Sequence, residues 1–400
     1  MMNPAVRCLF LSRVVLKNYR SIEACDVRLG SLVFLVGPNG SGKSNFVDAL
    51  RLTSDALNSS LDHALRDRGG IHEVRRRSSG HPTHFAIRLE FILSDGRRGH
   101  FAFEVGAKPR GEFIVKREEC FLPDAKYIVE DGKLTYPINE VYPPVSPGRL
   151  YLVNAAGLPQ FRLVFDELSR MGFYNVNPDA IRALQSPDAG EVLRRDGSNL
   201  ASVVARLGKV EDGSVKDRIA QYLGMVVPGL VDFNVKNVGH METLEFRQHV
   251  QGARDAWRFP AINMSDGTLR ALATLVALFQ ATVIEGVRFV GIEEPETALH
   301  PAAAGILRDC IMEASSAVQV LVTSHSAELL DDPDIAEDAI KAVDSQGGKT
   351  FIASLDSAGR SALRDRLYTA GELLRANQLY PDMNLVPGAT QLDLFGSADA

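Results

Sequence analysis

A glycine-rich octapeptide is the feature that most constrains this 400-residue chain. Residues 37–44 read GPNGSGKS and fit the pattern G-x-x-x-x-G-K-[ST] at every fixed position. The octapeptide follows an apolar run at 32–36 and precedes a segment, 43 to about 57, whose apolar residues recur at helical spacing. A strand, a glycine loop and a helix in that order direct backbone N–H groups and a helix N-terminus at one anion. The sequence therefore predicts a phosphate-binding loop in an α/β fold.

The polar side chains of this loop have distinct expected roles. Lys43 is expected to reach the β- and γ-phosphates of a nucleotide, and the Ser44 hydroxyl to ligate Mg²⁺. A glycine-rich turn that binds nothing is the alternative, but the motif and its context agree against it. The residues expected to surround the phosphates are Asn39, Gly40, Ser41, Gly42, Lys43, Ser44 and Asn45.

Two adjacent acids mark a second site. The apolar run 289–292 ends in Glu293 and Glu294, which places both carboxylates at the carboxyl edge of a sheet, where ligands bind in open α/β folds. Neighbouring residues on a strand point to opposite faces, so the two acids can differ in role. We expect Glu293 to hold hydrated Mg²⁺ and Glu294 to orient or deprotonate the attacking water. A solvated acidic strand end is the alternative, and the upstream phosphate loop disfavours it.

A histidine follows a second apolar run, at 318–323. A lone histidine is more often structural than functional. His325, however, comes at the end of a strand predicted to lie beside Glu294, which favours a contact between its imidazole and the γ-phosphate. Both apolar runs are typical of central parallel strands covered by helices on both faces.

The remaining pattern divides the chain into four parts. Strand-like runs from 84 to 131 predict an antiparallel sheet, 160–225 is mostly helical, and strand-like segments return at 231–246. We therefore expect an α/β fold with a mixed sheet flanked by helices, an antiparallel β subdomain and a helical insert. The expected parts are an N-terminal lobe at 1–150, a helical insert at 151–230, a C-terminal lobe at 231–380 and a flexible tail at 381–400.

Charge and cysteine content narrow the setting. Lys and Arg number 44 and Asp and Glu 50, giving a formal charge of −6, so any nucleic-acid surface must be local. The four cysteines are scattered, without the spacing of a zinc site or a disulfide framework, which fits a reducing cytoplasm. The N-terminus does not read as a signal peptide and no segment approaches 18 uncharged apolar residues, so we expect no membrane span.

The order of these motifs resembles the ATP-binding-cassette ATPases, and more closely their RecF, SMC and OLD-type branch. The resemblance is carried by LKNYRSI at 16–22, GPNGSGKSN, MSDGT at 264–268 and IEEPETALHP at 292–301. It implies an ABC-type head that binds ATP and Mg²⁺. It also implies that Ser265 and Gly267 contact the γ-phosphate of ATP held by a second copy, hence a homodimer, with 297–300 at the interface.

Two departures from that family stand out. No glutamine occurs between Ser44 and Pro159 to serve as the cassette glutamine, and Glu293 replaces the usual aspartate. The signature serine stands only 221 positions after Ser44, which leaves too few residues for an SMC arm. The 75 residues after His325 hold no carboxylate-rich TOPRIM domain, so we expect a stand-alone ATPase without nuclease activity.

Two segments suggest partners. A basic cluster after the first helix could neutralise phosphates of duplex DNA, although a solvated basic loop is an equal alternative. The tail pentapeptide QLDLF resembles the peptide by which bacterial repair proteins dock on the sliding clamp, with a chance match as the alternative. The cluster is Arg66, Arg68, Arg75, Arg76 and Arg77, and the pentapeptide is Gln391, Leu392, Asp393, Leu394 and Phe395.

These inferences combine into one expected function. We expect a cytoplasmic ATPase that dimerises on ATP, hydrolyses it through Glu294, and controls DNA binding or a DNA-bound partner in repair or genome maintenance. An ATPase subunit of an anti-phage defence system that regulates a separate nuclease is the alternative. A transporter subunit is disfavoured because Asp266-Gly267-Thr268 stands where Gly-Gly-Gln would follow the signature serine. A module that traps ATP without hydrolysis is the non-enzymatic option.

Overall fold

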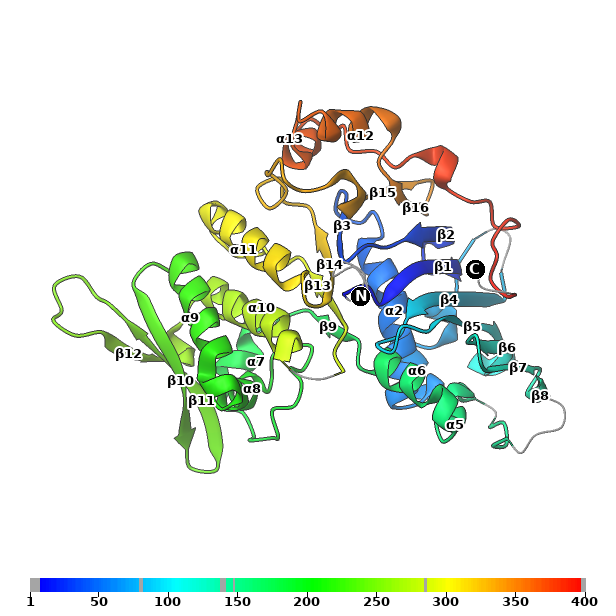
Figure 1. Cartoon of the computed structure of the whole chain (residues 1–400), viewed down its shortest axis with the longest axis horizontal. Coiled ribbons are helices and arrows are strands. Elements are labelled where there is room, and N and C mark those ends of the chain that lie inside the picture. Colours follow the sequence, from blue (N-terminus) through cyan, green and yellow to red (C-terminus); the bar gives the residue numbers. More distant parts are fainter. Residues whose placement is uncertain (1–7, 79–81, 137–141, 147, 284–285, 397–400) are drawn as a thin grey trace. The chain divides into compact units, whose positions relative to one another are not determined.

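The computed structural model describes residues 8–78, 82–136, 142–146, 148–283 and 286–396. The chain forms two compact units, shown in Figure 1. The first unit combines Met1–Met171, Ala336–Tyr368 and Ala376–Ala400, and the second combines Gly172–Ile335 with Thr369–Arg375. The division therefore differs from the expected boundaries at 150 and 230, because the chain returns to the first unit after residue 335.

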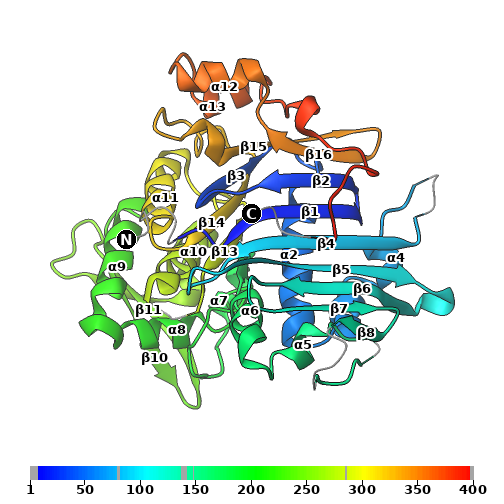
Figure 2. The same cartoon turned by 45° about the vertical axis from the view of Figure 1, so that its right-hand side comes forward.

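The first unit contains a seven-stranded antiparallel sheet in the order β2-β1-β4-β5-β6-β7-β8, seen in Figure 2. Alternation along β1 and β4 sends Leu16, Ile87 and Leu89 to one face and Arg13 and Arg88 to the other. The antiparallel β subdomain predicted for 84–131 is confirmed. The strands are β1 (Leu11–Tyr19), β2 (Ile22–Arg28), β4 (His84–Ile92), β5 (Arg98–Ala107), β6 (Phe113–Phe121), β7 (Lys126–Glu130) and β8 (Lys133–Tyr136).

The phosphate loop belongs to the first unit. It follows β3 (Leu32–Val36), which pairs in parallel with β15 (Ile340–Gln346), and β15 pairs antiparallel with β16 (Lys349–Ser354). After the loop comes α2 (Lys43–Asn58), which buries Phe46, Val47 and Leu50 on its apolar face. The other helices of this unit are α3 (Leu61–Arg66), α4 (Ile71–Val74), α5 (Leu152–Ala155), α6 (Pro159–Ser169) and α12 (Ser357–Arg364), with 3₁₀ turns at Pro109–Gly111, Glu337–Ala339 and Met383–Leu385.

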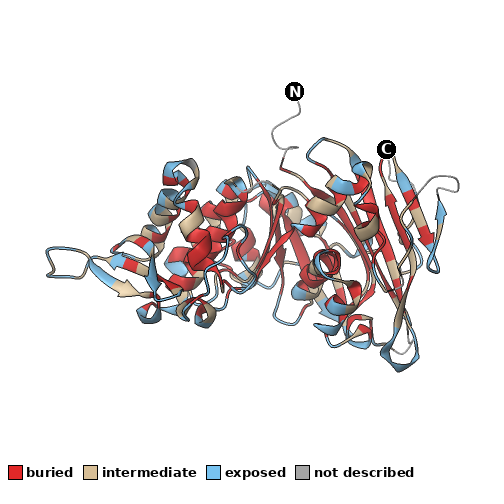
Figure 3. Cartoon of the chain, turned by 90° about the horizontal axis from the view of Figure 1, so that it is seen from below, coloured by how far each residue is buried: buried red, intermediate tan, exposed pale blue. Residues whose placement is uncertain are grey.

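Three parallel strands carry the acidic site of the second unit. β13 (Phe289–Glu293) lies between β14 (Gln319–Ser324) and β9 (Gly172–Tyr174). Both apolar runs predicted as buried strands are buried. Figure 3 draws the buried residues of the chain in red. β9 was not predicted: it falls inside the segment expected to be helical, because three residues, Gly-Phe-Tyr, give no usable periodicity.

Helices and a second small sheet complete the second unit. The long helix α10 (Asp266–Val283) is buried over most of its length. The three-stranded antiparallel sheet consists of β10 (Leu230–Val238), β11 (Met241–Gln248) and β12 (Trp257–Pro260). The other helices are α7 (Pro178–Arg182), α8 (Leu200–Leu207), α9 (Ser214–Val226), α11 (Pro301–Ala314) and α13 (Ala370–Arg375), with 3₁₀ turns at Val210–Gly213 and Ala261–Asn263.

The C-terminal residues differ from the expected flexible tail. Leu394 is buried against Val15 and Ala86 of the seven-stranded sheet, and Leu392 and Phe395 pack beside it. The Gly-, Asp- and Ala-rich composition after Pro381 predicted a flexible tail and gave no sign of this docking. Among the described residues, none of the helices combines the length and apolar character needed to cross a membrane.

Candidate nucleotide site

Glycines give the phosphate loop a backbone that other residues could not follow. Gly40 and Gly42 have φ angles of 77° and 105°, the left-handed region where a side chain is strained. At Gly37 a Cβ atom would stand 2.0 Å from the carbonyl oxygen of Val343. The loop is therefore closed around a narrow space, with the N-terminus of α2 at its end.

Lys43 and Ser41 are the buried polar groups of this loop. The Lys43 ammonium donates to the carbonyl oxygens of Gly37 and Pro38 at 2.8 and 3.0 Å, which holds the loop closed. The Ser41 hydroxyl oxygen is buried and has no hydrogen-bond partner among the described residues. Ser44, in contrast, is exposed in the first turn of α2.

A hydrogen-bond relay from distant parts of the chain supports the loop. The Thr350 hydroxyl lies 2.8 Å from the carbonyl oxygen of Ser41 and 2.7 Å from the Ser21 hydroxyl, and Asn45 Nδ2 donates to that Ser21 oxygen at 2.6 Å. Sequence reasoning found Asn45 but missed Ser21 and Thr350. Thr350 lies 309 positions from Ser41, and no local pattern links two such positions.

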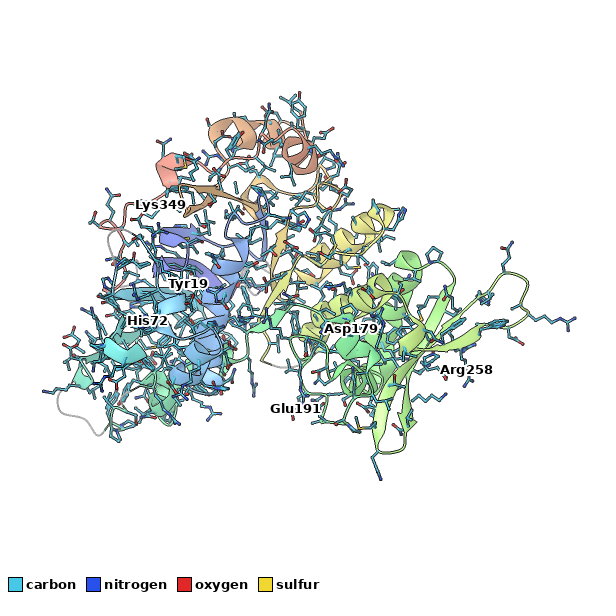
Figure 4. All side chains as sticks on the ribbon, turned by 180° about the vertical axis from the view of Figure 1, so that it is seen from behind. Tyr19, His72, Asp179, Glu191, Arg258 and Lys349 are labelled. Atoms are coloured by element: carbon cyan, nitrogen blue, oxygen red, sulfur yellow. The ribbon has the colours of Figure 1, made fainter. Side chains whose placement is uncertain are left out.

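A cavity of about 390 Å³ lies beside the loop, and Asn45 is part of its wall. Figure 4 locates it by three neighbours of its lining residues: Tyr19, His72 and Lys349. The cavity is strongly basic, with Glu73 as the acid in its lining. Its five arginines are Arg20, Arg68, Arg75, Arg76 and Arg77.

Asp48 of α2 organises these arginines. Its carboxylate accepts the Tyr19 hydroxyl at 2.8 Å and forms ion pairs with Arg20 and Arg68 at 2.9 Å and with Arg51. Burial acts to raise the pKa of Asp48, but Arg68, Arg51 and Arg20 hold it below its usual value. The end of β1 and the segment after α3 are thereby fixed to the helix that begins at the phosphate loop.

The basic cluster predicted to meet DNA is divided by the structure. Arg68 and Arg76 are buried: Arg68 pairs with Asp48 and Asp55, and Arg76 donates to the carbonyl oxygens of Ser21 and Gly348. These two therefore serve the fold. The remaining three arginines are at least partly exposed, with Arg66 paired to Asp62, Arg77 paired to Glu73, and Arg75 donating to the Pro82 carbonyl oxygen.

The second unit holds the predicted acids. Glu293 ends β13, and its Oε1 lies 3.2 Å from Arg195 Nη2. The parallel register pairs Ile292 with Tyr174, so the exposed Asn175 follows β9 at the same sheet edge as Glu293. Sequence reasoning missed the roles of Arg195 and Asn175, because β9 was not predicted.

Glu294 adopts a conformation that non-glycine residues rarely hold. Its φ angle is 45°, which costs about 1–3 kcal/mol and is characteristic of functional sites. The Glu294 N–H donates to the carbonyl and hydroxyl oxygens of Thr323 at 3.0 and 3.2 Å, which fixes this geometry. Its carboxylate lies 3.4 Å from His325 Nδ1. The structure thus brings together the two residues predicted to be catalytic.

Glu296 forms hydrogen bonds with the segment that carries His325. Its Oε1 accepts the Ser324 hydroxyl at 2.6 Å and the His325 N–H at 3.3 Å, and its buried Oε2 has no partner among the described residues. Glu296 therefore positions the turn that carries His325.

The signature turn is a helix cap. The Ser265 hydroxyl accepts the Thr268 N–H at 3.2 Å and so caps α10, while remaining exposed. A Cβ at Gly267 would stand 2.5 Å from the carbonyl oxygen of Ala298, whose own φ is 66°. The turn is therefore packed against the loop that the family resemblance placed at a dimer interface.

The residues of the first unit fit a nucleoside triphosphate with Mg²⁺. Ser41 offers a buried, unsatisfied hydroxyl, Gly40 faces open space, and the exposed Ser44 is a hard oxygen donor of the kind Mg²⁺ prefers.

Comparisons with known proteins give the same class. The family model described as "AAA domain, putative AbiEii toxin, Type IV TA system" matches residues 32–149 and 160–331. The Old nuclease of Escherichia phage P2 is 21% identical over an alignment that covers 96% of this chain and 69% of that protein. The DNA replication and repair protein RecF of Vibrio cholerae is 49% identical over 43 residues, 10% of this chain and 12% of RecF, so the match spans about one eighth of that relative.

Solved SMC heads share the fold. The Smc head domain with an extended coiled coil bound to the C-terminal domain of ScpA, from Pyrococcus furiosus, has a TM-score of 0.56 at 14% identity, covering 90% of this chain and 99% of that one. The SmcHead bound to the C-winged helix domain of ScpA has a TM-score of 0.55 at 14% identity, covering 88% and 99%. Fold and motifs thus define an ABC-type ATPase of the RecF/SMC/OLD-like branch. The chain belongs to the AAA-domain family whose model it matches.

Proposed function

We propose that this protein hydrolyses ATP in a homodimer and uses the cycle to control binding to DNA or to a DNA-associated partner in the cytoplasm. The observation that carries the proposal is the Glu294–His325 pair, held at 3.4 Å on a strained backbone at the end of a buried strand, in a chain with a closed phosphate loop. Strained backbone conformations cluster at functional sites. The strain at Glu294 therefore favours a catalytic role over that of a solvated surface charge.

Each residue has a proposed role in the reaction. Lys43 would leave its two carbonyl partners to bind phosphate oxygens, and Ser41 would donate its free hydroxyl. Ser44 and Glu293 would hold Mg²⁺, which supplies charge neutralisation to the phosphates when bound. Glu294 would accept the proton of the attacking water, and His325 would stabilise the γ-phosphate. The exposed Asn175 amide would take the role of the cassette glutamine, which has no counterpart between Ser44 and Pro159.

The test of hydrolysis separates binding from turnover. Glu294→Gln should keep ATP binding and lose at least about 100-fold in turnover, the contribution typical of a general base. Lys43→Ala should lose ATP binding itself. The matched control is Glu191→Gln, an exposed acid of the second unit labelled in Figure 4. Turnover by Glu294→Gln at the wild-type rate would rule out the assigned base, and a chain that binds ATP without turnover in any form would be a trapping module.

The homodimer is proposed from the signature turn. Ser265 is exposed and heads α10, so its hydroxyl and the helix N-terminus form an anion site that a second copy's ATP could complete. With hydrolysis blocked by Glu294→Gln, light scattering should report a dimer in ATP and a monomer without it. Adding Ser265→Arg should abolish the dimer while each copy still binds ATP.

DNA contact is proposed through the three arginines of the basic cluster that reach solvent. Duplex binding should weaken as salt rises and should fall further when Arg66, Arg75 and Arg77 are changed to Glu together. Replacing three exposed arginines elsewhere, Arg98, Arg254 and Arg258, gives the control of equal charge change. Equal losses in both variants would mean that these arginines form no specific DNA surface. The sliding clamp is the proposed protein partner, through Gln391–Phe395.

A second candidate is an ATPase subunit of an anti-phage defence system that regulates a separate nuclease. The likeness to the Old nuclease over 96% of this chain favours it. Cells that carry the chain with its neighbouring genes would then resist phage infection, and Glu294→Gln would remove that resistance. Plaque counts for the two strains test this candidate.

A further inference from the structure

The face of the seven-stranded sheet that carries Arg13 and Arg88 is polar, with a small apolar island. Register places Val15, Lys17, Ala86 and Arg88 on this face of β1 and β4. Val15 and Ala86 are fully buried even so, because Leu394 covers them. The segment Gln391–Gly396, which we name the tail segment, crosses the strands here, and Figure 2 shows its path in red.

Polar contacts fix the tail segment on both sides of that island. The Gly396 N–H donates to Glu119 Oε1 at 2.8 Å, and the Arg88 guanidinium lies 3.5 Å from the carbonyl oxygens of Leu394 and Gly396. The Arg117 guanidinium stacks over the Phe395 ring, 4.7 Å from its centre. The tail segment thus lies on an apolar floor that offers an acceptor for one of its N–H groups and a donor for its carbonyl oxygens.

Glu119 is itself prepared for this role. It is buried and accepts hydrogen bonds from His100 Nε2 at 2.9 Å and Arg117 Nη2 at 3.0 Å. The two side chains orient its carboxylate toward the tail segment. The sheet therefore presents a site whose polar groups are held in place by neighbours that are not part of the tail segment.

Leu394 and Phe395 are also the residues that the pocket of a partner would bind. A pocket that recognises the QLDLF peptide must accept Leu394 and Phe395, and in the docked state Leu394 is buried under its own chain. Gln391 is also engaged, because its Oε1 accepts the Gly388 N–H at 3.1 Å. Docking on the sheet and docking on a partner exclude one another.

We propose that this face of the sheet is a peptide-binding site whose ligand is the tail segment, and that docking there withholds the segment from a partner with an apolar Leu-Phe pocket. The identity of that partner, the sliding clamp, rests on the proposed function, whereas the docking does not. The docked state is reversible, because one buried leucine and a few polar contacts oppose the entropy of ordering six residues. A partner then binds with an affinity reduced by the fraction of chains whose tail is released.

Docking is tested by hydrogen exchange of the whole chain. The fragment that contains Gly396 should exchange slowly in the wild type and at least about tenfold faster in Leu394→Ser, because the apolar anchor is lost. Arg117→Ala should give an intermediate rate. Arg98→Ala, an exposed arginine at the start of β5, is the matched control and should exchange as the wild type does. Exchange in the wild type as fast as in the free peptide 387–400 would overturn the docking.

Withholding is tested by titrating labelled clamp. The free peptide 387–400 should bind at least about tenfold more tightly than the whole chain, since only released chains compete. Arg117→Ala should bind more tightly than the wild type, and Arg98→Ala as the wild type does. Equal affinities for peptide and whole chain would overturn withholding. If the clamp binds neither, the partner assignment fails, and the exchange result still decides the docking.

Discussion

Arg195 Nη2 lies 3.2 Å from Glu293 Oε1, so the acid expected to hold Mg²⁺ is paired to a guanidinium within its own unit. The pair competes with a metal ion for the same carboxylate. A partly exposed ion pair contributes up to about 1 kcal/mol.

Replacing Arg195 by Ala should therefore lower the Mg²⁺ concentration needed for half-maximal ATP hydrolysis by about two- to fivefold. Titration of turnover with Mg²⁺ measures the change, and Arg194→Ala, which removes an ion pair with Asp188 instead, is the control. A higher Mg²⁺ requirement in Arg195→Ala would show that the guanidinium assists the reaction instead of competing with the metal.

A methyl group is expected to destabilise the phosphate loop more at Gly37 than at Gly40. At Gly37 a Cβ would meet the Val343 carbonyl oxygen at 2.0 Å, whereas at Gly40 no described atom lies within 4 Å and the cost is that of its φ alone. Gly37→Ala should cost about 1–3 kcal/mol of unfolding free energy from overpacking, and Gly40→Ala about 1 kcal/mol.

Urea unfolding of the two variants compares these costs, and ATP titration reports the loop. Both variants should bind ATP more weakly. An unfolding free energy for Gly37→Ala equal to that of the wild type would mean that β15 moves freely away from the loop.

Thr350 should control the loop from 309 positions away. Thr350→Val keeps the shape but leaves the Ser41 carbonyl oxygen and the Ser21 hydroxyl without this partner, at a cost of about 1–3 kcal/mol. We expect lower stability and weaker ATP binding. Thr135→Val, which removes an exposed hydroxyl bonded to the Ile128 carbonyl oxygen, should change neither by more than about 0.5 kcal/mol.

Asp48 should make the first unit sensitive to acid. Because its pKa is held below the usual 3.8, the folded state binds fewer protons there than the unfolded state. Its contribution is then fully present above that value and is lost as pH falls through the lowered pKa. Asp48→Asn leaves three arginines without their buried partner and should cost about 3 kcal/mol at pH 7. The difference from wild type in urea unfolding should shrink below about pH 4, and a constant difference would contradict the role of the charge.

The parts of the site that sequence reasoning found are those written in consecutive residues. The glycine loop, the helix from Lys43 and the buried strand before Glu293 each combine a short motif with a matching period. The missed parts depend on tertiary pairing. Thr350 reaches the loop only because β15 pairs with β3, and Asn175 reaches the acidic edge only because three residues join a sheet.

Other differences come from energies that a sequence pattern does not show. The positive φ of Glu294 is an unfavourable local conformation, held by the hydrogen bonds that its N–H donates to two oxygens of Thr323, so local propensity predicts a different conformation. Arg68 and Arg76 were predicted to meet either DNA or solvent. In the structure Arg68 pairs with Asp48, and Arg76 donates to two carbonyl oxygens. Leu394 stands in a polar tail, and its burial depends on an apolar island formed by Val15 and Ala86.

The relay through Thr350 also sets an order of events during synthesis. Ser41 leaves the ribosome 309 residues before Thr350 does, which at translation speeds is roughly 15 to 60 s. During that interval the nascent loop lacks the hydrogen bond from the Thr350 hydroxyl. For most of it the loop also lacks strand β15, whose Val343 packs against Gly37. A newly made chain therefore becomes able to bind nucleotide only near the end of translation. A messenger RNA truncated before codon 350 would yield a protein that has the glycine motif but lacks the completed binding site.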